Sequence, residues 1–317
     1  MDKRPLVMSC GDPSGIGPEI AAKAWEAVGA DCPFVWLGDP RHLPAGVAFR
    51  MVEDVADCGG SALPVLPVAF AAHARAGQPD PANAAGVIEA IRYGVELVQS
   101  GSARGLVTCP IHKAALKSGA GFGFPGHTEF LAHLAGVDRV VMMLASDALR
   151  VVPVTIHIPL AEVPSALTPE LLEQTIRITH AALIRDFGIA SPRLAVAGLN
   201  PHAGEDGTMG QEDRDLIAPV LDRLRAEGLD LRGPLPADTM FHGAARARYD
   251  AAICMYHDQA LIPIKTLAFD EGVNVTLGLP FVRTSPDHGT AYDIAGKGVA
   301  KPDSLIAAIR MAWNMGA

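Results

Sequence analysis

Three histidines each lie at or just after a short apolar run that has the length of a buried strand and is too short for a helix. Carboxyl ends of parallel strands collect at one edge of a sheet, so we expect three imidazoles to converge there. Three imidazoles with an open fourth position form a catalytic divalent metal site, and imidazole favours zinc, cobalt, nickel or iron over magnesium. The runs and their histidines are 150–158 with His157, 193–199 with His202, and 251–256 with His257.

The alternative is that each of these histidines is an ordinary core or surface residue without a functional role. The chain has no H-E-x-x-H or other local metal motif, so the metal hypothesis rests on the shared position of the three side chains.

A second group of side chains has the character of an anion clamp. Lys265, Asn274 and Arg283 supply two cations and an amide within the loop-rich segment that follows His257. Their apolar neighbours argue against the alternative, which is a solvated charged face. Upstream, a helix is expected to begin at His127 or Thr128, where free N–H groups favour a phosphate or a carboxylate. The alternative for Thr128 is a simple helix N-cap.

Glycine-rich turns offer a third kind of candidate. The turn 11–19 joins an expected strand to a helix, and its free N–H groups favour an anion; the alternative is a plain tight turn. The literal G-x-G-x-x-G at 121–126 is rejected as a dinucleotide fingerprint, because no strand precedes it and Pro125 interrupts it. The turn 287–290 either contacts a cofactor or caps the next helix through Asp287.

Expected strands alternate with expected helices along the whole chain, which predicts an α/β fold with a largely parallel sheet. Pro153 places its strand at an edge or a bulge, and Thr168 is the expected N-cap of a long helix. Residues 41–80 are irregular and 233–239 form a rigid loop. The expected strands are 5–10, 34–37, 105–108, 140–144, 150–158, 193–199 and 251–256, and the helices 20–28, 83–98, 114–120, 168–187, 211–227 and 304–315.

Composition excludes several classes of protein. The 317 residues suffice for one large or two medium domains, and the net charge of −9 argues against nucleic-acid binding. A few local cations can still focus an anionic substrate. No apolar run approaches the roughly 20 residues of a membrane span, and the N-terminus lacks the apolar core of a signal peptide. Five scattered cysteines without C-x-x-C spacing indicate reduced thiols of a cytoplasmic protein.

Five motifs occur in order along nearly the whole chain: GDPSGIGPE from Gly11, GHTE from Gly126, LNPHAGE from Leu199, YHDQ from Tyr256 and RTSPDHGTA from Arg283. Together they resemble the 4-hydroxythreonine-4-phosphate dehydrogenase family. The resemblance implies a fold like that of the isocitrate and isopropylmalate dehydrogenases, with two α/β/α domains and the active site in the cleft. The domains would be 1–125 plus 293–317, and 126–292 with the metal ligands and the dimer interface.

By the same resemblance, the site is built in a homodimer, with the third histidine coming from the other subunit. One divalent metal per site (zinc, cobalt or magnesium) and NAD or NADP are implied, and no residue is assigned to the nicotinamide cofactor. Two local departures from the family pattern, Ala260 and Pro286, touch no proposed ligand. The implied metal ligands are His157, His202 and His257, and the implied substrate binders are His127, Thr128, Lys265, Asn274 and Arg283.

The implied reaction is oxidation of the C3 hydroxyl of 4-phosphohydroxy-L-threonine, then metal-assisted decarboxylation to 3-amino-2-oxopropyl phosphate, in pyridoxine 5'-phosphate biosynthesis. The three histidines and Lys265 are the catalytic candidates, and either Lys265 or a metal-bound water takes the hydroxyl proton. The alternatives are a threonate or erythronate 4-phosphate dehydrogenase of sugar-acid catabolism, a phosphoacyl transferase, and a phosphatase. The histidine trio argues against the transferase, and the lack of a carboxylate-rich two-metal pattern argues against the phosphatase.

Overall fold

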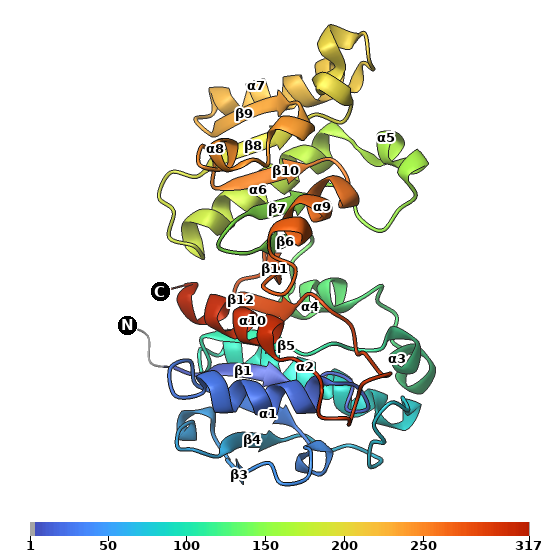
Figure 1. The fold of residues 1–317 in the computed structure, drawn as a ribbon, viewed down its shortest axis with the longest axis vertical. Helices are drawn as coiled ribbons and strands as arrows, with labels where there is room; N and C mark the ends of the chain where they lie inside the picture. Colours follow the sequence, from blue (N-terminus) through green and yellow to red (C-terminus); the bar gives the residue numbers. More distant parts are fainter. Residues whose placement is uncertain (1–3, 317) are drawn as a thin grey trace. The chain divides into compact units, whose positions relative to one another are not determined.

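The computed structural model describes residues 4–316 and confirms an α/β fold (Figure 1). It divides into two compact units, one running up to Val140 and resuming at Val273, the other spanning Val141–Gly272. The boundaries of these units, 140/141 and 272/273, differ from the expected boundaries at 125/126 and 292/293. Helix α4 (His127–Ala135) packs on α2 (Ala84–Gln99) within the first unit, which explains the later first boundary.

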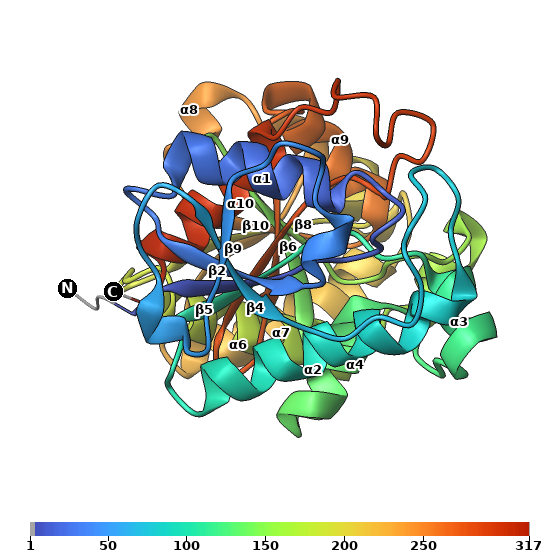
Figure 2. The ribbon, with the colours of Figure 1, turned by 90° about the horizontal axis from the view of Figure 1, so that it is seen from below.

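The first unit is built on a sheet whose strands run in the order β3-β4-β2-β1-β5-β12-β11. All neighbours are parallel except β11 and β12, which are antiparallel. Helices α1 (Gly17–Val28) and α10 (Asp303–Asn314) cover one face and α2 the other (Figure 2). The strands are β1 Leu6–Ser9, β2 Phe34–Gly38, β3 Phe49–Met51, β4 Leu63–Pro67, β5 Gly105–Thr108, β11 Val273–Leu277 and β12 Val282–Pro286.

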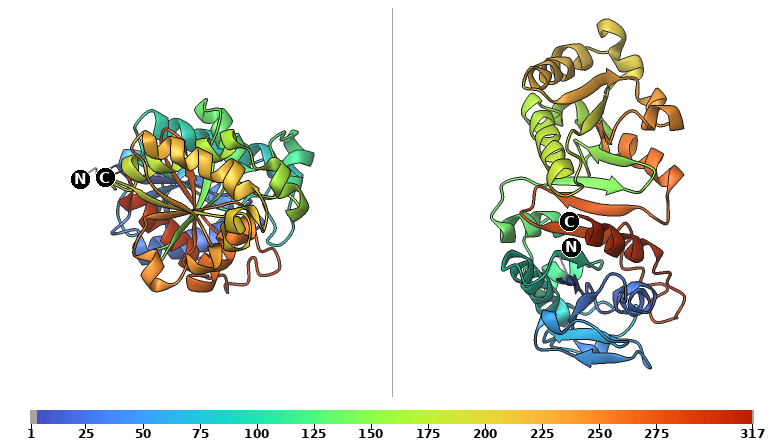
Figure 3. Two further views of the ribbon diagram at one scale, coloured as in Figure 1. Left: turned by 90° about the horizontal axis from the view of Figure 1, so that it is seen from above. Right: turned by 90° about the vertical axis from the view of Figure 1, so that its left-hand side faces the viewer.

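The second unit has the strand order β6-β7-β10-β8-β9. Strands β7, β10, β8 and β9 are mutually parallel, and β6 is antiparallel to β7. Helices α6 (Pro169–Arg185) and α7 (Ala218–Ala226) cover one face, while α8 (Gly243–Arg246) and α9 (His257–Leu267) lie on the other (Figures 2 and 3). The strands are β6 Val141–Ala145, β7 Arg150–Pro153, β8 Arg193–Ala197, β9 Asp230–Leu235 and β10 Ala251–Cys254.

Burial explains why these runs form strands. Every residue of β1, β2, β5 and β10 is buried, as expected where helices cover both faces of a parallel sheet. Such strands are continuous apolar runs rather than alternating ones, which is why the sequence predicts them well. The expected helices 83–98, 114–120 and 304–315 are found within one or two residues as α2, α3 (Lys113–Ala120) and α10.

The interpretation of Pro153 was wrong. Strand β7 lies between β6 and β10, so it is not an edge strand, and it ends at Pro153 instead of continuing to 158. Pro153 is the last residue of its strand, so its missing N–H does not interrupt the strand pairing. The next amide, Val154 N–H, donates to the Cys254 carbonyl at 2.8 Å. His157 therefore lies in a turn beyond the strand.

Three other segments are more regular than expected. The segment after His257 is helix α9 followed by β11 and β12, not a loop-rich stretch. The expected rigid loop 233–239 begins with the end of β9, and the irregular region 41–80 contains β3 and β4. The G-x-G-x-x-G runs from the end of α3, at Gly121, to the N-cap of α4, at Gly126, so its rejection is confirmed. Among residues 4–316, no helix is both long and apolar enough to cross a membrane.

The N-cap expected at Thr168 is confirmed, because its hydroxyl oxygen accepts a hydrogen bond from Leu171 N–H at 3.2 Å at the start of α6. We predict that Thr168→Ala lowers the free energy of unfolding by about 1 kcal/mol, since one helix-end N–H loses its partner. Urea denaturation followed by circular dichroism measures this. Thr168→Ser keeps the hydroxyl and serves as the control, and equal stability of the Ala variant and the native chain would contradict the assignment.

Candidate active site

The three histidine-bearing turns follow adjacent parallel strands of the second unit. His157 comes after β7, His202 after β8 and His257 after β10, at the first residue of α9, and β10 pairs with both neighbouring strands. The expected placement at the carboxyl ends of parallel strands is therefore confirmed. This edge of a parallel sheet is where ligands bind in open α/β folds.

Two side chains tie these turns together. The Thr155 hydroxyl donates to the Met255 carbonyl at 2.7 Å, which joins the turn after β7 to the turn after β10. The Gln259 amide accepts from Met255 N–H at 2.6 Å and donates to the Gly198 carbonyl at 2.7 Å, which joins the turns after β10 and β8. The sheet edge is therefore cross-linked by buried or half-buried polar contacts.

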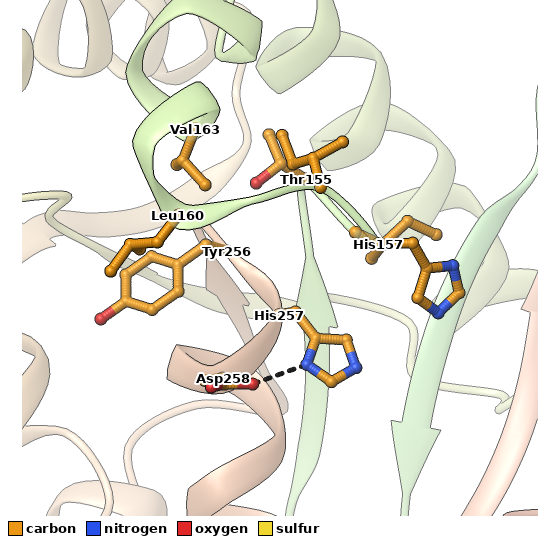
Figure 4. Close-up of a pocket in the computed structure, with 9 residues that line it drawn as sticks. Thr155, His157, Leu160, Val163, Tyr256, His257 and Asp258 are labelled. Atoms are coloured by element: carbon orange, nitrogen blue, oxygen red, sulfur yellow. Dashed lines mark hydrogen bonds and ion pairs between the residues drawn. The ribbon is translucent and has the colours of Figure 1, made fainter.

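His157 and His257 form a close pair, with ring centroids 5.8 Å apart (Figure 4). Asp258 Oδ1 lies 2.7 Å from His257 Nδ1, so the tautomer with its proton on Nδ1 donates to this carboxylate. That tautomer leaves the Nε2 lone pair available, and a carboxylate behind a histidine is the usual support of a metal ligand. The donor chemistry of the pair therefore fits a divalent metal ion.

A cavity of about 240 Å³ adjoins the pair. Its polar lining includes Thr155, His157, His257 and Asp258 (Figure 4). The apolar lining comes from Ile156, Ile158, Leu160, Val163 and Tyr256.

His202 stands apart from this pair in the single chain. Its side chain is 62% exposed, and its nearest acidic group is Glu205, with Nδ1 and Oε2 3.8 Å apart. Across residues 4–316, no group of three His, Cys, Asp or Glu side chains could hold a metal ion. One chain thus brings together two of the three imidazoles that the sequence singled out.

Arg283 is a buried cation of the first unit. It lies in β12, only 3% exposed, and its terminal nitrogens donate to two neutral hydroxyls, Thr276 Oγ1 at 2.8 Å and Thr108 Oγ1 at 2.6 Å. Its Nε has no partner, and no ion pair to Arg283 occurs in the described part of the chain. Burial lowers the pKa of this guanidinium to about 10. A buried cation without a carboxylate is suited to an anionic ligand.

His127 is the first residue of α4, and Gly126 is the N-cap, so the alternative role of Thr128 as N-cap was wrong. The buried Nε2 of His127 has no partner. Burial, Arg283 and Lys113 together hold the pKa of His127 well below its usual range, so this imidazole is neutral near pH 7. A neutral imidazole and free helix N–H groups beside two cations can bind an anion.

Asn274 and Lys265 complete the predicted set. Asn274 lies in β11, opposite Ser285 of β12, and its buried Oδ1 has no partner. Lys265 belongs to the second unit, in α9, where its Nζ lies 5.6 Å from the centre of the Phe269 ring. The predicted residues thus divide between the units, with the imidazole group and Lys265 in one and the expected anion-binding group in the other.

The glycine-rich turn 11–19 is part of a larger ordered structure. Ile16 N–H donates to the Thr290 carbonyl at 3.0 Å, and the Tyr292 hydroxyl donates to Asp12 Oδ2 at 2.7 Å. The turn therefore packs on the segment that follows β12. Asp287 does not cap the next helix, because the N-cap of α10 is Pro302.

Comparison with known proteins identifies the family of the chain. The family model described as "Pyridoxal phosphate biosynthetic protein PdxA" matches residues 30–312. The chain belongs to the PdxA family. A PdxA-type relative from Paracoccus denitrificans (strain Pd 1222), named 4-hydroxythreonine-4-phosphate dehydrogenase, is 65% identical over 100% of this chain and 99% of its own.

Solved structures confirm the expected PdxA fold. A 4-hydroxythreonine-4-phosphate dehydrogenase from Klebsiella pneumoniae superimposes with a TM-score of 0.90 at 35% identity, covering 98% of both chains. Isocitrate dehydrogenase from Methylococcus capsulatus, at 17% identity and a TM-score of 0.50, covers 97% of this chain and 84% of its own. The latter likeness concerns the fold alone, and it confirms the expected similarity of fold to the isocitrate dehydrogenases.

Arg283, the buried cation of β12, leads to a prediction about phosphate binding. Inorganic phosphate should raise the unfolding temperature of the native chain, because it binds the folded protein only. Arg283→Gln should remove most of that increase, since the amide carries no charge. Differential scanning fluorimetry with and without phosphate measures both. Arg248→Gln on the second unit is the matched control, and an undiminished phosphate effect in Arg283→Gln would rule out this anion site.

Proposed function

We propose that this chain is a 4-hydroxythreonine-4-phosphate dehydrogenase, which oxidises 4-phosphohydroxy-L-threonine with a nicotinamide cofactor and releases carbon dioxide. The full-length identity of 65% with a relative of that name carries the proposal. The residues of the site are consistent with it, because the substrate class combines a phosphate, a carboxylate and a hydroxyl. The first unit offers groups for anions and the second offers imidazoles.

The anion-binding residues hold the substrate in this proposal. Arg283 presents a desolvated guanidinium whose direction is set by Thr108 and Thr276, so its binding geometry is ready before substrate arrives. His127 and Thr128 add side chains at the N-terminus of α4. Asn274 adds an amide oxygen with unused hydrogen-bonding capacity, suited to a donor group of the substrate.

His157, His202 and His257 are the residues proposed to hold a divalent ion, with zinc, cobalt and magnesium as candidates. When bound, such an ion supplies Lewis acidity at a substrate oxygen, which favours loss of the hydroxyl proton and then of carbon dioxide. Asp258 fixes the tautomer of His257. The single chain pairs only His157 and His257, which supports a homodimer in which the partner copy completes the set.

Lys265 is the proposed proton acceptor of the chain itself. It lies on the same helix as His257 and is half-buried, so a helix that positions the imidazole also positions the amine. Its ammonium form would additionally hold the substrate carboxylate. NAD, or NADP in its place, would supply the hydride acceptor for C3. The threonate and erythronate 4-phosphates are the alternative substrates, because they carry the same phosphate and hydroxyl groups.

Absorbance in the NADH band tests the reaction and the substrate together. With zinc or cobalt present, the purified chain should reduce NAD with 4-phosphohydroxy-L-threonine and much more slowly with D-threonate or D-erythronate 4-phosphate. A faster rate with either sugar-acid phosphate would replace the proposed substrate. No NADH from any of the three, with NAD or NADP, would reject the dehydrogenase.

The histidine set is tested separately. His202→Ala should lose at least about tenfold in metal affinity and most of its turnover, because one imidazole ligand is removed. Equilibrium dialysis with Zn²⁺ and the NADH assay measure these two quantities. His180→Ala, on α6, is the matched control and should behave as the native chain. If His202→Ala kept both its metal content and its turnover, the three-histidine hypothesis would fail.

A further inference from the structure

The backbone around His202 is strained. His202, Ala203, Glu205 and Asp206 all have positive φ, between 41° and 56°, and Gly204 among them has φ 78°. Left-handed backbone costs about 1 kcal/mol or more for each non-glycine residue. Such a run persists only where surrounding contacts hold it, and strained backbone clusters at functional sites.

Asp213 is the residue that holds the start of this run. It begins a turn of π-helix, Asp213–Ile217, that leads into α7. Its Oδ1 accepts from Leu199 N–H at 2.8 Å, and its Oδ2 accepts from Asn200 N–H at 3.1 Å and from the Asn200 side-chain Nδ2 at 3.0 Å. Both carboxylate oxygens are thus used on the two residues that precede Pro201 and His202.

The fit around this carboxylate is close. Asp213 is 1% exposed, and no ion pair to it occurs in the described part of the chain, so its partners are neutral N–H groups. A Cβ placed on Gly198 would lie 2.6 Å from Asp213 Oδ1, and one on Gly204 would lie 3.2 Å from Asp213 Cβ. The carboxylate therefore packs against both ends of the turn that carries His202.

We propose that Asp213 is a positioning residue for His202, holding its backbone in the left-handed conformation that presents the imidazole to a divalent metal ion. This inference rests on the proposed function of His202 as a ligand. Asp213 contacts no reacting group itself. It acts by accepting three hydrogen bonds from the turn, just as Gln259 and Thr155 fix the other two turns of the sheet edge.

The isosteric substitution Asp213→Asn tests this. One acceptor oxygen becomes an NH₂ donor, and in either orientation it faces N–H groups that need an acceptor. We expect the Kd for Co²⁺ to rise about tenfold, within the range seen when supporting groups of metal ligands are lost. The visible absorption of bound Co²⁺, which reports its ligand set, should shift as well. Asp215→Asn, an exposed carboxylate on the same turn, is the control.

A double-mutant cycle separates positioning from general destabilisation. In the His202→Ala background, Asp213→Asn should cause no further loss of Co²⁺ affinity, because the side chain it positions is already absent. A further tenfold loss there would show that Asp213 acts elsewhere and would overturn the inference. Thermal unfolding of each variant without metal provides the measure of any loss of stability.

The outcomes distinguish this inference from the proposed function. If the native chain bound Co²⁺ and Asp213→Asn bound it equally well, only the inference would fall. If the native chain bound no divalent ion, the metal-dependent function would fall and the inference with it. Should Asp213→Asn not fold, Asn200→Ala tests the same contact by removing its Nδ2 donor, and unchanged Co²⁺ affinity in that variant would overturn the inference.

Discussion

The site of the second unit depends on polar side chains that bind backbone groups across neighbouring turns. Strand pairing fixes the ends of β7, β10 and β8, but it does not fix the conformation of the residues beyond them. Thr155 and Gln259 extend the sheet's hydrogen bonding past its edge, into the turns around the three histidines. A buried donor or acceptor left without a partner costs about 1–3 kcal/mol, so these contacts also disfavour any other arrangement of the turns.

This arrangement explains why the position of the histidines was predictable and their mutual geometry was not. The apolar runs before His157, His202 and His257 are recognisable in the sequence because parallel strands covered by helices are continuously apolar. The distances among the rings depend on turn conformations, including a left-handed run at His202, and nothing in the local sequence signals four non-glycine residues with positive φ. The spacing of the histidines in the sequence likewise does not predict that His157 and His257 lie close together while His202 lies apart from them.

The residues proposed to bind anions show the same limit. Residue type and motif singled out Arg283, but the sequence placed it in a loop, whereas it is buried in β12. Thr108 and Thr276, which hold its guanidinium, lie far from it in the sequence or look like ordinary strand residues, and only strand order brings them together. Among the elements, β9 and α9 were missed because Gly233 and Pro234 suggest a loop and Pro263 suggests a helix break, while tertiary contacts override both preferences.

The burial of Arg283 against two neutral hydroxyls, those of Thr108 and Thr276, has a consequence for the effect of salt on the protein. Dissolved salt weakens attraction between exposed charges over a Debye length of about 8–10 Å, because mobile counter-ions gather around them. Mobile counter-ions cannot gather around the Arg283 guanidinium, because it is only 3% exposed. Anion binding by Arg283, as proposed, would therefore be governed by local geometry and desolvation, and it should persist at ionic strengths that abolish binding to surface lysines.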